Sequence, residues 1–253
     1  MSAPILIEKP SRQPGVLCIR FNRPEKKNAI TAAMYRAMVD ALQAAENEQE
    51  IRAVVFLGSE NCFSAGNDIG DFLAAAAGGK LGQDILDFLH ALVDCKKPLV
   101  SGVDGLAIGI GTTLHLHCDL TIASSRSRFQ TPFVDLALVP EAASSLIAPR
   151  VMGNQRAFAL LALGEAFSAE EAKDAAIVWK VVEPDEVERE ALDVAMRLAS
   201  KPPEALAIAR QLLRGNAGEI HQRIDDEAMH FSARLTSTEA RAAFEAFMRK
   251  SRR

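Results

Sequence analysis

The sequence has few cysteines and no long apolar run, and both absences narrow what the protein can be. Its 253 residues contain four cysteines, none of them in a C-x-x-C pair. A zinc knuckle or a disulfide framework is therefore not expected, and four reduced thiols fit a cytoplasmic protein. The apolar runs are too short to span a membrane, and the first residues lack the basic start and apolar stretch of a signal peptide. We expect no bound metal and no membrane contact.

The sequence also lacks a large excess of either positive or negative charge. The 29 Lys and Arg residues and 33 Asp and Glu residues leave a net charge of −4, so we expect no nucleic-acid partner. Hydrophobic residues make up 49% and charged residues 25% of the chain, which is typical of a folded globular protein. At this length one α/β domain, alone or with a smaller appendage, can bury a core without disulfides or metals.

Strand-like and helix-like segments alternate along the first part of the chain. The apolar runs at 15–21 and 51–58 predict strands, and the second is continuous, as in a strand covered on both faces. Between them, Thr31 can cap an amphipathic helix over 32–50, and a second such helix is predicted over 84–95. Further strands are predicted within 97–105, 118–124 and 176–182. This alternation predicts an α/β fold with parallel strands.

The chain after about residue 185 is predicted to be helical. Pro202 and Pro203 begin one helix and Gly215 ends it, in the usual proline-first, glycine-last order. The alanine-rich segment 72–84 is predicted to be a mobile loop. Two capping boxes are predicted, Ser168 with Glu171 and Thr236 with Glu239. We divide the chain into a core, residues 1–195, and a helical C-terminal region, residues 196–253.

Two glycine-containing turns are candidates for chemistry. They are "CFSAGNDI" at 62–69 and "GVDGLAIGIGTTLHLHCD" at 102–119. Neither has the spacing of a dinucleotide-binding or Walker loop. Such turns expose backbone N–H groups, and two of these aimed at one point would form an oxyanion hole. Taken by themselves, the glycines are better explained by backbone geometry.

Glu141 is the candidate catalytic residue. Between Arg128 and Arg150 only Asp135 and Glu141 carry charge, and Glu141 follows a proline in an otherwise apolar or small stretch. Such a carboxylate either caps the helix expected near 142–150 or is half-desolvated, which raises its pKa and makes it a stronger base. Asp135 is expected to face solvent or to pair with an arginine. From these residues alone the cap is the better interpretation.

Other polar residues are weaker candidates. His115 and His117 do not share a helix face, which argues against a metal pair. Ser144 and Ser145 lack the G-x-S-x-G setting of a serine nucleophile. Trp179 is expected in the core or at an interface.

Five segments of the chain form a set. They are "RFNRPEKKNAI", "CFSAGNDI", "VDGLAIGIGTTL", "RFQTPFVDLALVPEAASS" and "GEAFSAEEAKDAAIVWKVV". In this order and at these spacings they resemble the enoyl-CoA hydratase/isomerase family, also called the crotonase superfamily, over about residues 15–215. The resemblance implies a ClpP/crotonase-like α/β fold, with a spiral core of ββα units and an α-helical C-terminal region. It also implies an acyl-CoA substrate, a role in fatty acid metabolism such as β-oxidation, and a homotrimer or a dimer of trimers.

The same resemblance implies a site for the thioester. The backbone N–H groups of Asn67 and Ile110 would hold its oxygen in an oxyanion hole. The substrate's coenzyme A would lie along the first turn and the two glycine turns, and no other cofactor or metal is implied. The residues implied to bind it are Lys27, Ala29, Ser64, Ala65, Gly66, Asp68 and Gly109.

The reaction is indicated by which carboxylates are present. Hydratases of the family use two glutamates, at positions where this chain has Thr113 and Phe133. Hydration needs one group to activate water and another to manage the α-carbon proton, so ordinary hydratase chemistry is not expected. The stretch 131–145 resembles the peroxisomal-type Δ3,Δ2-enoyl-CoA isomerases, in which Glu141 would move a proton from the α-carbon to the γ-carbon. The alternatives are a hydratase, another acyl-CoA reaction such as thioester hydrolysis or decarboxylation, and a non-catalytic acyl-CoA-binding protein.

Overall fold

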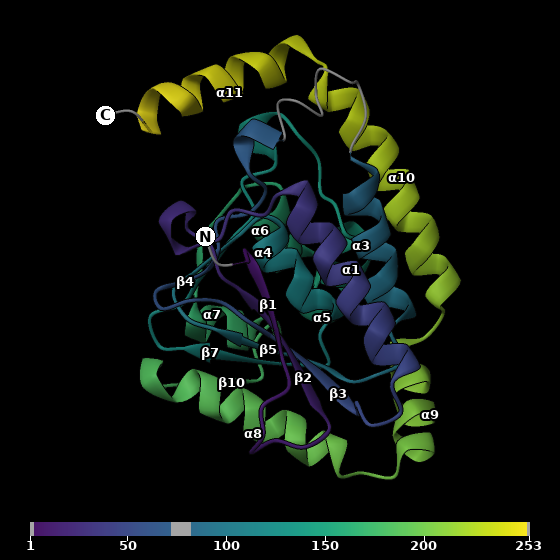
Figure 1. Ribbon diagram of the computed structural model, residues 1–253. Coiled ribbons are helices and arrows are strands. Elements are labelled where there is room, and N and C mark those ends of the chain that lie inside the picture. Colours follow the sequence, from purple (N-terminus) through teal and green to yellow (C-terminus); the bar gives the residue numbers. More distant parts are fainter. Residues whose placement is uncertain (1–2, 72–81, 252–253) are drawn as a thin grey trace.

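The computed structural model describes residues 3–71 and 82–251, and its strands form two sheets (Figure 1). In spatial order the larger sheet comprises β1 (Ile5–Glu8), β2 (Val16–Phe21), β3 (Ala53–Leu57), β5 (Leu99–Val103), β7 (Leu120–Ser124) and β10 (Lys180–Val182). The smaller sheet comprises β4 (Cys62–Ser64), β6 (Leu106–Ile108), β8 (Arg128–Gln130) and β9 (Phe167–Ser168). Neighbouring strands are parallel except for the pairs β1–β2 and β8–β9.

Successive strand pairs build a spiral. The pairs β3–β4, β5–β6 and β7–β8 each place their first strand in the larger sheet and their second in the smaller sheet. The helices α3 (Gln83–Asp94), α4 (Ile110–Thr113) and α5 (Ser144–Met152) follow these pairs in turn. Because each unit adds one strand to the larger sheet and one to the smaller sheet, the chain winds along the two sheets as a spiral. The predicted α/β fold, with its spiral of ββα units, is confirmed.

The larger sheet is covered on both faces. Along β3, Ala53, Val55 and Leu57 pack toward α8 (Val187–Ala199). The alternate residues Val54 and Phe56 pack into the main core together with α1 (Ala32–Asn47) and α3. Figure 1 shows α8 along one side of the sheet and α1 with α3 on the other. The apolar segment 51–58 therefore forms the strand covered on both faces that its composition predicted.

Most predicted helices begin where their caps were placed. The Thr31 side chain accepts a hydrogen bond from the Met34 N–H, and α1 ends at Asn47, three residues earlier than predicted. The capping box of Ser168 and Glu171 is present at the start of α7 (Ala169–Asp174). Helix α9 (Pro203–Arg214) begins at a proline and is followed by Gly215, as predicted. Helix α6 (Asn154–Leu161) follows α5.

The second predicted capping box is wrong by one residue. Thr236 is the C-cap residue that follows α10 (Ala217–Leu235); its backbone is still in the right-handed helical region, and its hydroxyl donates to the Ala233 carbonyl at 3.2 Å. Ser237 instead caps α11 (Thr238–Ser251), accepting from the Ala240 N–H at 3.1 Å. Because α10 uses Thr236 to finish its last turn, this residue cannot take the extended backbone of an N-cap.

The strand predicted at 176–182 is shorter than expected. Ala176 has a left-handed backbone (φ 57°) just after α7, so the chain turns there and only Lys180–Val182 joins the sheet. Trp179 is 48% exposed, so the core alternative for this side chain is wrong, and its interface alternative stays a prediction. Of the predicted loop 72–84, residues 72–81 lie outside the described residues, and Gln83 and Asp84 already belong to α3.

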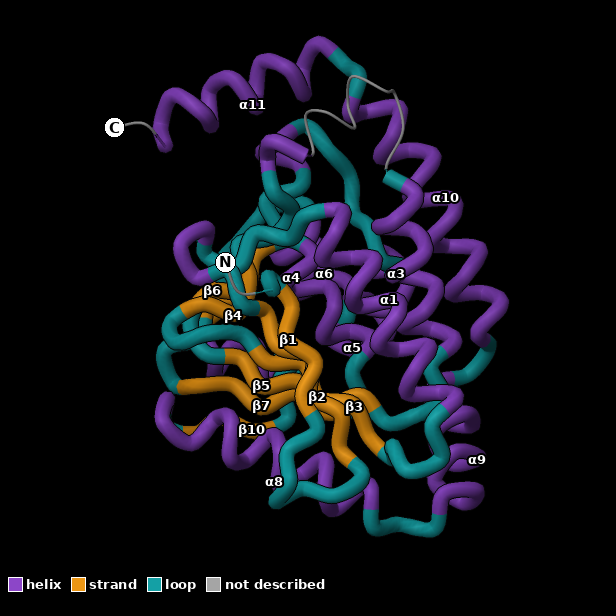
Figure 2. The backbone as a smooth tube through the Cα atoms, viewed as in Figure 1, coloured by secondary structure: helices purple, strands orange, loops and turns teal. Residues whose placement is uncertain are grey.

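Helices dominate the C-terminal part of the chain. Helices α9 and α10 run along one side of the molecule, and α11 crosses its end (Figure 2). The predicted boundary after residue 195 falls within α8, and the division into two regions stays a prediction. None of the helices in the described ranges is both long and apolar enough to cross a bilayer.

Candidate active site

A pocket of about 130 Å³ lies where the two glycine-containing turns meet. The turns contribute Asn67 and Ile110 to its wall, and Glu141 comes from the segment before α5. Most of the remaining wall is apolar. It includes four phenylalanines: Phe133, Phe231, Phe244 and Phe247. Among the described residues that line this pocket, Glu141 is the only one with an ionisable side chain.

The first turn is paired with the chain around Ile30. The Ile30 N–H donates to the Gly66 carbonyl at 2.8 Å, and the Asp68 N–H donates to the Ile30 carbonyl at 2.8 Å. Because successive N–H groups of extended backbone alternate in direction, the Asn67 N–H points away from this pairing, while Asn67 itself lines the pocket. The Asn67 side chain is fixed by the Tyr35 hydroxyl, which donates to Oδ1 at 2.6 Å.

The second turn presents the start of a helix. Gly109 has φ 58° and ψ −122°, a backbone that favours glycine, and α4 begins at Ile110. The first N–H groups of a helix have no intrahelical acceptor and carry a partial positive charge, so the Ile110 N–H can serve a negative oxygen. A Cβ on Gly111 would lie 2.9 Å from the Ser64 carbonyl oxygen. Glycine therefore lets α4 seat directly against the first turn.

Glu141 is held in an apolar environment. Glu141 is 4% exposed, and its Oε1 accepts a hydrogen bond of 2.5 Å from Oγ1 of Thr113. Burial raises the pKa of Glu141 from 4.5 to about 8; the Thr113 hydrogen bond opposes this shift and the charge of Glu227 adds to it. The upward direction expected from sequence is confirmed, and a carboxylate of this kind is a stronger base than an exposed one.

The backbone after Glu141 turns its side chain inward. Ala142 and Ala143 both have left-handed backbones, with φ of 62° and 53°, a conformation that costs an L-residue roughly 1–2 kcal/mol. His117 Nε2 bonds to the Ala142 carbonyl at 2.7 Å, and the Ser144 N–H donates to the Glu141 carbonyl at 3.1 Å. Helix α5 begins without a side-chain cap from its own N-cap residue. Because the Glu141 carboxylate accepts from Thr113 of α4, and the N-cap residue of α5 is Ala143, the helix-cap alternative for Glu141 is wrong.

The residues predicted to bind coenzyme A fall into three groups. Ala65, Gly66 and Gly109 line the pocket. Lys27 and Ala29 lie beside it on the first turn, which is joined to the glycine turn by the Ala65 N–H donating to the Lys27 carbonyl at 2.9 Å. Lys27 is exposed.

Ser64 and Asp68 have partners inside the protein. The Ser64 hydroxyl donates to the Asn28 carbonyl at 2.9 Å and accepts from the Gly66 N–H at 3.1 Å. Asp68 pairs with Arg23 at 2.7 Å. Partial burial by itself would raise the pKa of Asp68. The hydrogen bond from Arg23 and those from two backbone N–H groups outweigh burial and hold this pKa below its ordinary value. Both side chains hold the turn in shape.

The weaker candidates take structural places. His115 and His117 are buried, and burial lowers their pKa values to about 3 and about 4, so both are neutral at pH 7. The described ranges group no three His, Cys, Asp or Glu side chains into a metal site. Asp135 is exposed, one of its two predicted alternatives, and Ser144 is buried.

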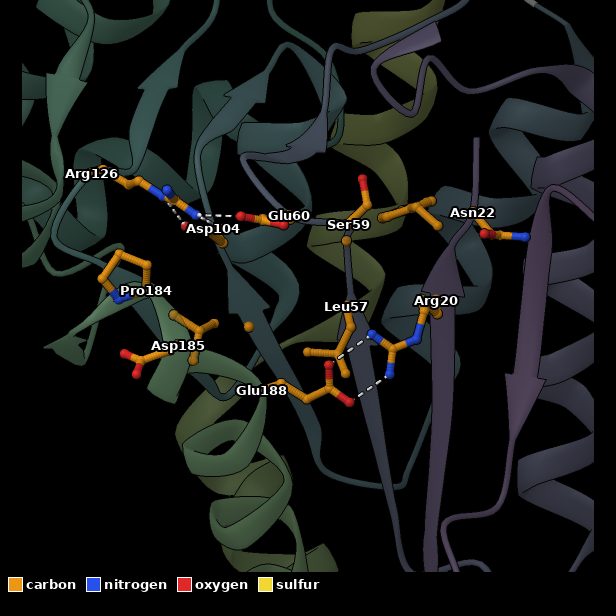
Figure 3. Close-up of a pocket in the computed structure, with 14 residues that line it drawn as sticks. Arg20, Asn22, Leu57, Ser59, Glu60, Asp104, Arg126, Pro184, Asp185 and Glu188 are labelled. Carbon is orange, nitrogen blue, oxygen red and sulfur yellow. Dashed lines mark hydrogen bonds and ion pairs between the residues drawn. The ribbon is translucent and has the colours of Figure 1, made fainter. Parts of the chain in front are cut away.

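A larger hollow of about 620 Å³ lies elsewhere, at the carboxyl ends of β2, β3 and β5. Figure 3 shows Arg20 pointing to Glu188 and Arg126 pointing to Asp104 and Glu60. The first two pairs are 2.7 and 2.6 Å apart. None of the sequence-predicted site residues lines this hollow, so the smaller pocket with Glu141 is the candidate active site.

Three residues that shape the site were missed from sequence. Asn28 bonds through Nδ2 to the carbonyls of Cys62 and Phe63, Tyr35 anchors Asn67, and Glu227 accepts from the backbone of the Glu141 segment. Glu227 carries a readable signal, since it is an acid on the helical stripe of buried apolar residues Ile224, Ala228 and Phe231. Tyr35 is the only tyrosine in the chain, which gives no pattern to read.

The arrangement is suited to removing a proton next to a carbonyl group. A buried carboxylate can take the proton, and two backbone N–H donors can stabilise the negative oxygen that results. The apolar wall excludes water from the charge that develops.

Comparisons with known proteins find a matching family model and similar proteins. The family model described as "Enoyl-CoA hydratase/isomerase" matches residues 11–252. "Enoyl-CoA delta isomerase 2" of Rattus norvegicus is 35% identical over 240 residues, which cover 92% of this chain and 61% of that protein. "2,3-dehydroadipyl-CoA hydratase" of Escherichia coli is 32% identical over 81% of this chain and 80% of its own. This chain thus spans about three fifths of the length of the rat isomerase.

Solved structures show the same fold. The structure of Pseudomonas aeruginosa OdaA superposes with a TM-score of 0.92 at 39% sequence identity, covering 98% of this chain and 99% of that one. The crotonase fold implied by the sequence motifs is therefore confirmed.

Proposed function

This chain belongs to the enoyl-CoA hydratase/isomerase family, and we propose that it isomerises 3-enoyl-CoA thioesters to 2-enoyl-CoA thioesters. The observation that carries this proposal is the single carboxylate, Glu141, among the described residues lining the pocket. Hydration needs a base for water and an acid for the α-carbon. A 1,3-proton shift needs one group that takes a proton and then returns it.

The reaction follows from the geometry in two steps. The Glu141 carboxylate takes a proton from the α-carbon, and the electrons move into a dienolate whose charge rests on the thioester oxygen. The N–H groups of Asn67 and Ile110 stabilise that oxygen, each being worth about 2.7–4 kcal/mol of barrier by analogy with other oxyanion holes. Protonated Glu141 then gives the proton to the γ-carbon, so the double bond moves and no atom is gained or lost.

Two residues at the hydratase positions support an isomerase. The Thr113 hydroxyl donates its hydrogen bond to Glu141, and Phe133 is a buried apolar residue, 6% exposed, in the pocket wall. Neither can activate water. The raised pKa of Glu141, about 8, suits a group that must act as base and then as acid near neutral pH.

The binding site for the coenzyme A part of the substrate is also part of the proposal. Coenzyme A would lie along Lys27, Ala29, Ser64, Ala65, Gly66, Asp68 and Gly109. The homotrimer or dimer of trimers and the cytoplasmic location are predictions from sequence.

The test gives the purified protein trans-3-hexenoyl-CoA and follows formation of the conjugated 2-enoyl thioester, with hydration of crotonyl-CoA measured in parallel. Conjugation without hydration is the expected result. Hydration alone would contradict the proposal, because it would need a second catalytic group. If the protein converts neither substrate, the proposed isomerisation is wrong. The fold assignment would stand, and the function would be another acyl-CoA reaction or acyl-CoA binding alone.

A further inference from the structure

Helix α10 holds the segment that carries Glu141. Oε1 of Glu227, a residue 6% exposed, accepts from the Ser145 N–H at 2.9 Å. Four residues earlier on the same helix face, Arg223 donates from Nη1 to the Ser145 hydroxyl at 3.0 Å. Since α5 has no side-chain cap of its own, Glu227 supplies from α10 the acceptor that the start of α5 lacks.

The segment between Glu141 and Ser145 needs such support. Its two left-handed alanines, Ala142 and Ala143, are strained, so the neighbouring structure must select this conformation. His117 holds the Ala142 carbonyl from one side, and Glu227 holds Ser145 from the other. Between them these bonds fix where the Glu141 side chain points.

We propose that Glu227 is a positioning residue, which clamps the Glu141 segment onto α10 and whose carboxylate, when ionised, interacts unfavourably with the Glu141 carboxylate. The inference rests on the proposed role of Glu141 as the base. Glu227 does not line the pocket, so it acts through Glu141 and not on the substrate.

The charges around the pair are few. Glu141 accepts from Thr113 of α4 and interacts electrostatically with Tyr35 of α1 and Glu227 of α10. Burial raises the pKa of Glu227, and its hydrogen bond from the Ser145 N–H and the charge of Arg223 on its own helix oppose that shift. His117, whose imidazole bonds to the Ala142 carbonyl of the segment, is neutral at pH 7 because burial lowers its pKa to about 4. Burial raises the pKa of Glu141, and the Glu227 charge raises it further. Removing that charge should therefore make Glu141 easier to ionise.

The experiment follows the titration of Glu141 by NMR in protein labelled with 13C at glutamate carboxyls, the signal being assigned from Glu141→Gln. Glu227→Gln keeps the shape and an oxygen for Ser145 but removes the charge. We expect the Glu141 midpoint to move to lower pH by about half a unit or more. The matched control is Asp226→Asn, the same loss of charge at the exposed neighbouring position, which should leave the midpoint unchanged. An unchanged midpoint in folded Glu227→Gln would overturn the inference.

Wild-type protein alone provides a second measurement if Glu227→Gln does not fold. The Glu141 signal should show a second inflection where Glu227 titrates, because the two carboxylates interact; a single inflection would count against the inference. Neither titration uses substrate. A protein that fails to convert 3-enoyl-CoA would refute the proposed function, while the titration would still decide the role of Glu227.

A third variant distinguishes the hydrogen bond that Glu227 makes to the segment from the effect of its charge. Glu227→Ala removes both, so Glu141 should be misplaced and kcat at its high-pH plateau should fall about ten- to a hundredfold below that of Glu227→Gln. Equal plateau values for the two variants would show that Glu227 does not position the segment.

Discussion

Replacing Thr113 by valine should move the pH dependence of catalysis upward. The Thr113 hydroxyl donates to Oε1 of Glu141 at 2.5 Å, and both residues are buried. Valine has nearly the same shape, so the main loss is one hydrogen bond to a charged group, worth about 1.5–3 kcal/mol. Because 1.36 kcal/mol corresponds to one pH unit, the pKa of Glu141, about 8 in the wild type, should rise by roughly one to two units.

The sign follows from the role of Glu141 as base. Only its ionised form can take the α-proton, so kcat/KM should rise with pH through the pKa of the free enzyme. In Thr113→Val the rising limb shifts to higher pH, and activity at pH 7 falls about ten- to a hundredfold because less Glu141 is ionised. The plateau at high pH should change much less.

The assay is kcat/KM for trans-3-hexenoyl-CoA measured between about pH 6 and pH 10. Thr113→Ser, which keeps the hydroxyl, is the matched control and should retain the wild-type limb. A Thr113→Val limb that stays in place or moves to lower pH would refute the assignment of that limb to Glu141.

Two further predictions concern stability and the glycine-containing turn that carries Asn67. The ordinary pKa of Glu141 is 4.5 and its folded value is about 8, so the folded state holds a proton that the unfolded state loses between these pH values, and stability falls as pH rises across this window. Glu141→Gln should therefore be more stable than the wild type by about 3 kcal/mol at pH 7 and equal to it below pH 4.5, as measured by denaturant unfolding; a difference independent of pH would contradict this. Tyr35→Phe removes the 2.6 Å hydrogen bond to Asn67 and should lower kcat about tenfold with a smaller change in KM, whereas steady-state kinetics equal to wild type would show that the turn does not depend on it.

The two glycine-containing turns and the candidate glutamate, Glu141, could be singled out from sequence because the motifs that carry the family resemblance are local. The family resemblance implied Asn67 and Ile110, each directly after a glycine with a positive φ, and the structure brings both residues to one pocket. The division of the strands was also readable, since β3 alternates between two buried faces.

What the sequence could not provide was long-range or conformational. Whether Glu141 caps a helix or enters a pocket depends on the left-handed backbones of Ala142 and Ala143, and alanine gives no signal for such a backbone. Thr113 was read only as a missing glutamate, whereas in the fold its hydroxyl meets Glu141. Glu227 lies on a helix distant in the chain, and its contact with Ser145 exists only after folding.

The most direct test of the central claim is the conversion of trans-3-hexenoyl-CoA by Glu141→Gln. Asp135→Asn is the control, since Asp135 is the other acid between Arg128 and Arg150 and is exposed. If Glu141 moves the proton, Glu141→Gln should keep its fold by circular dichroism and lose isomerase activity by at least about a hundredfold, while Asp135→Asn stays near the wild type. Near-full activity in folded Glu141→Gln would remove Glu141 from the mechanism.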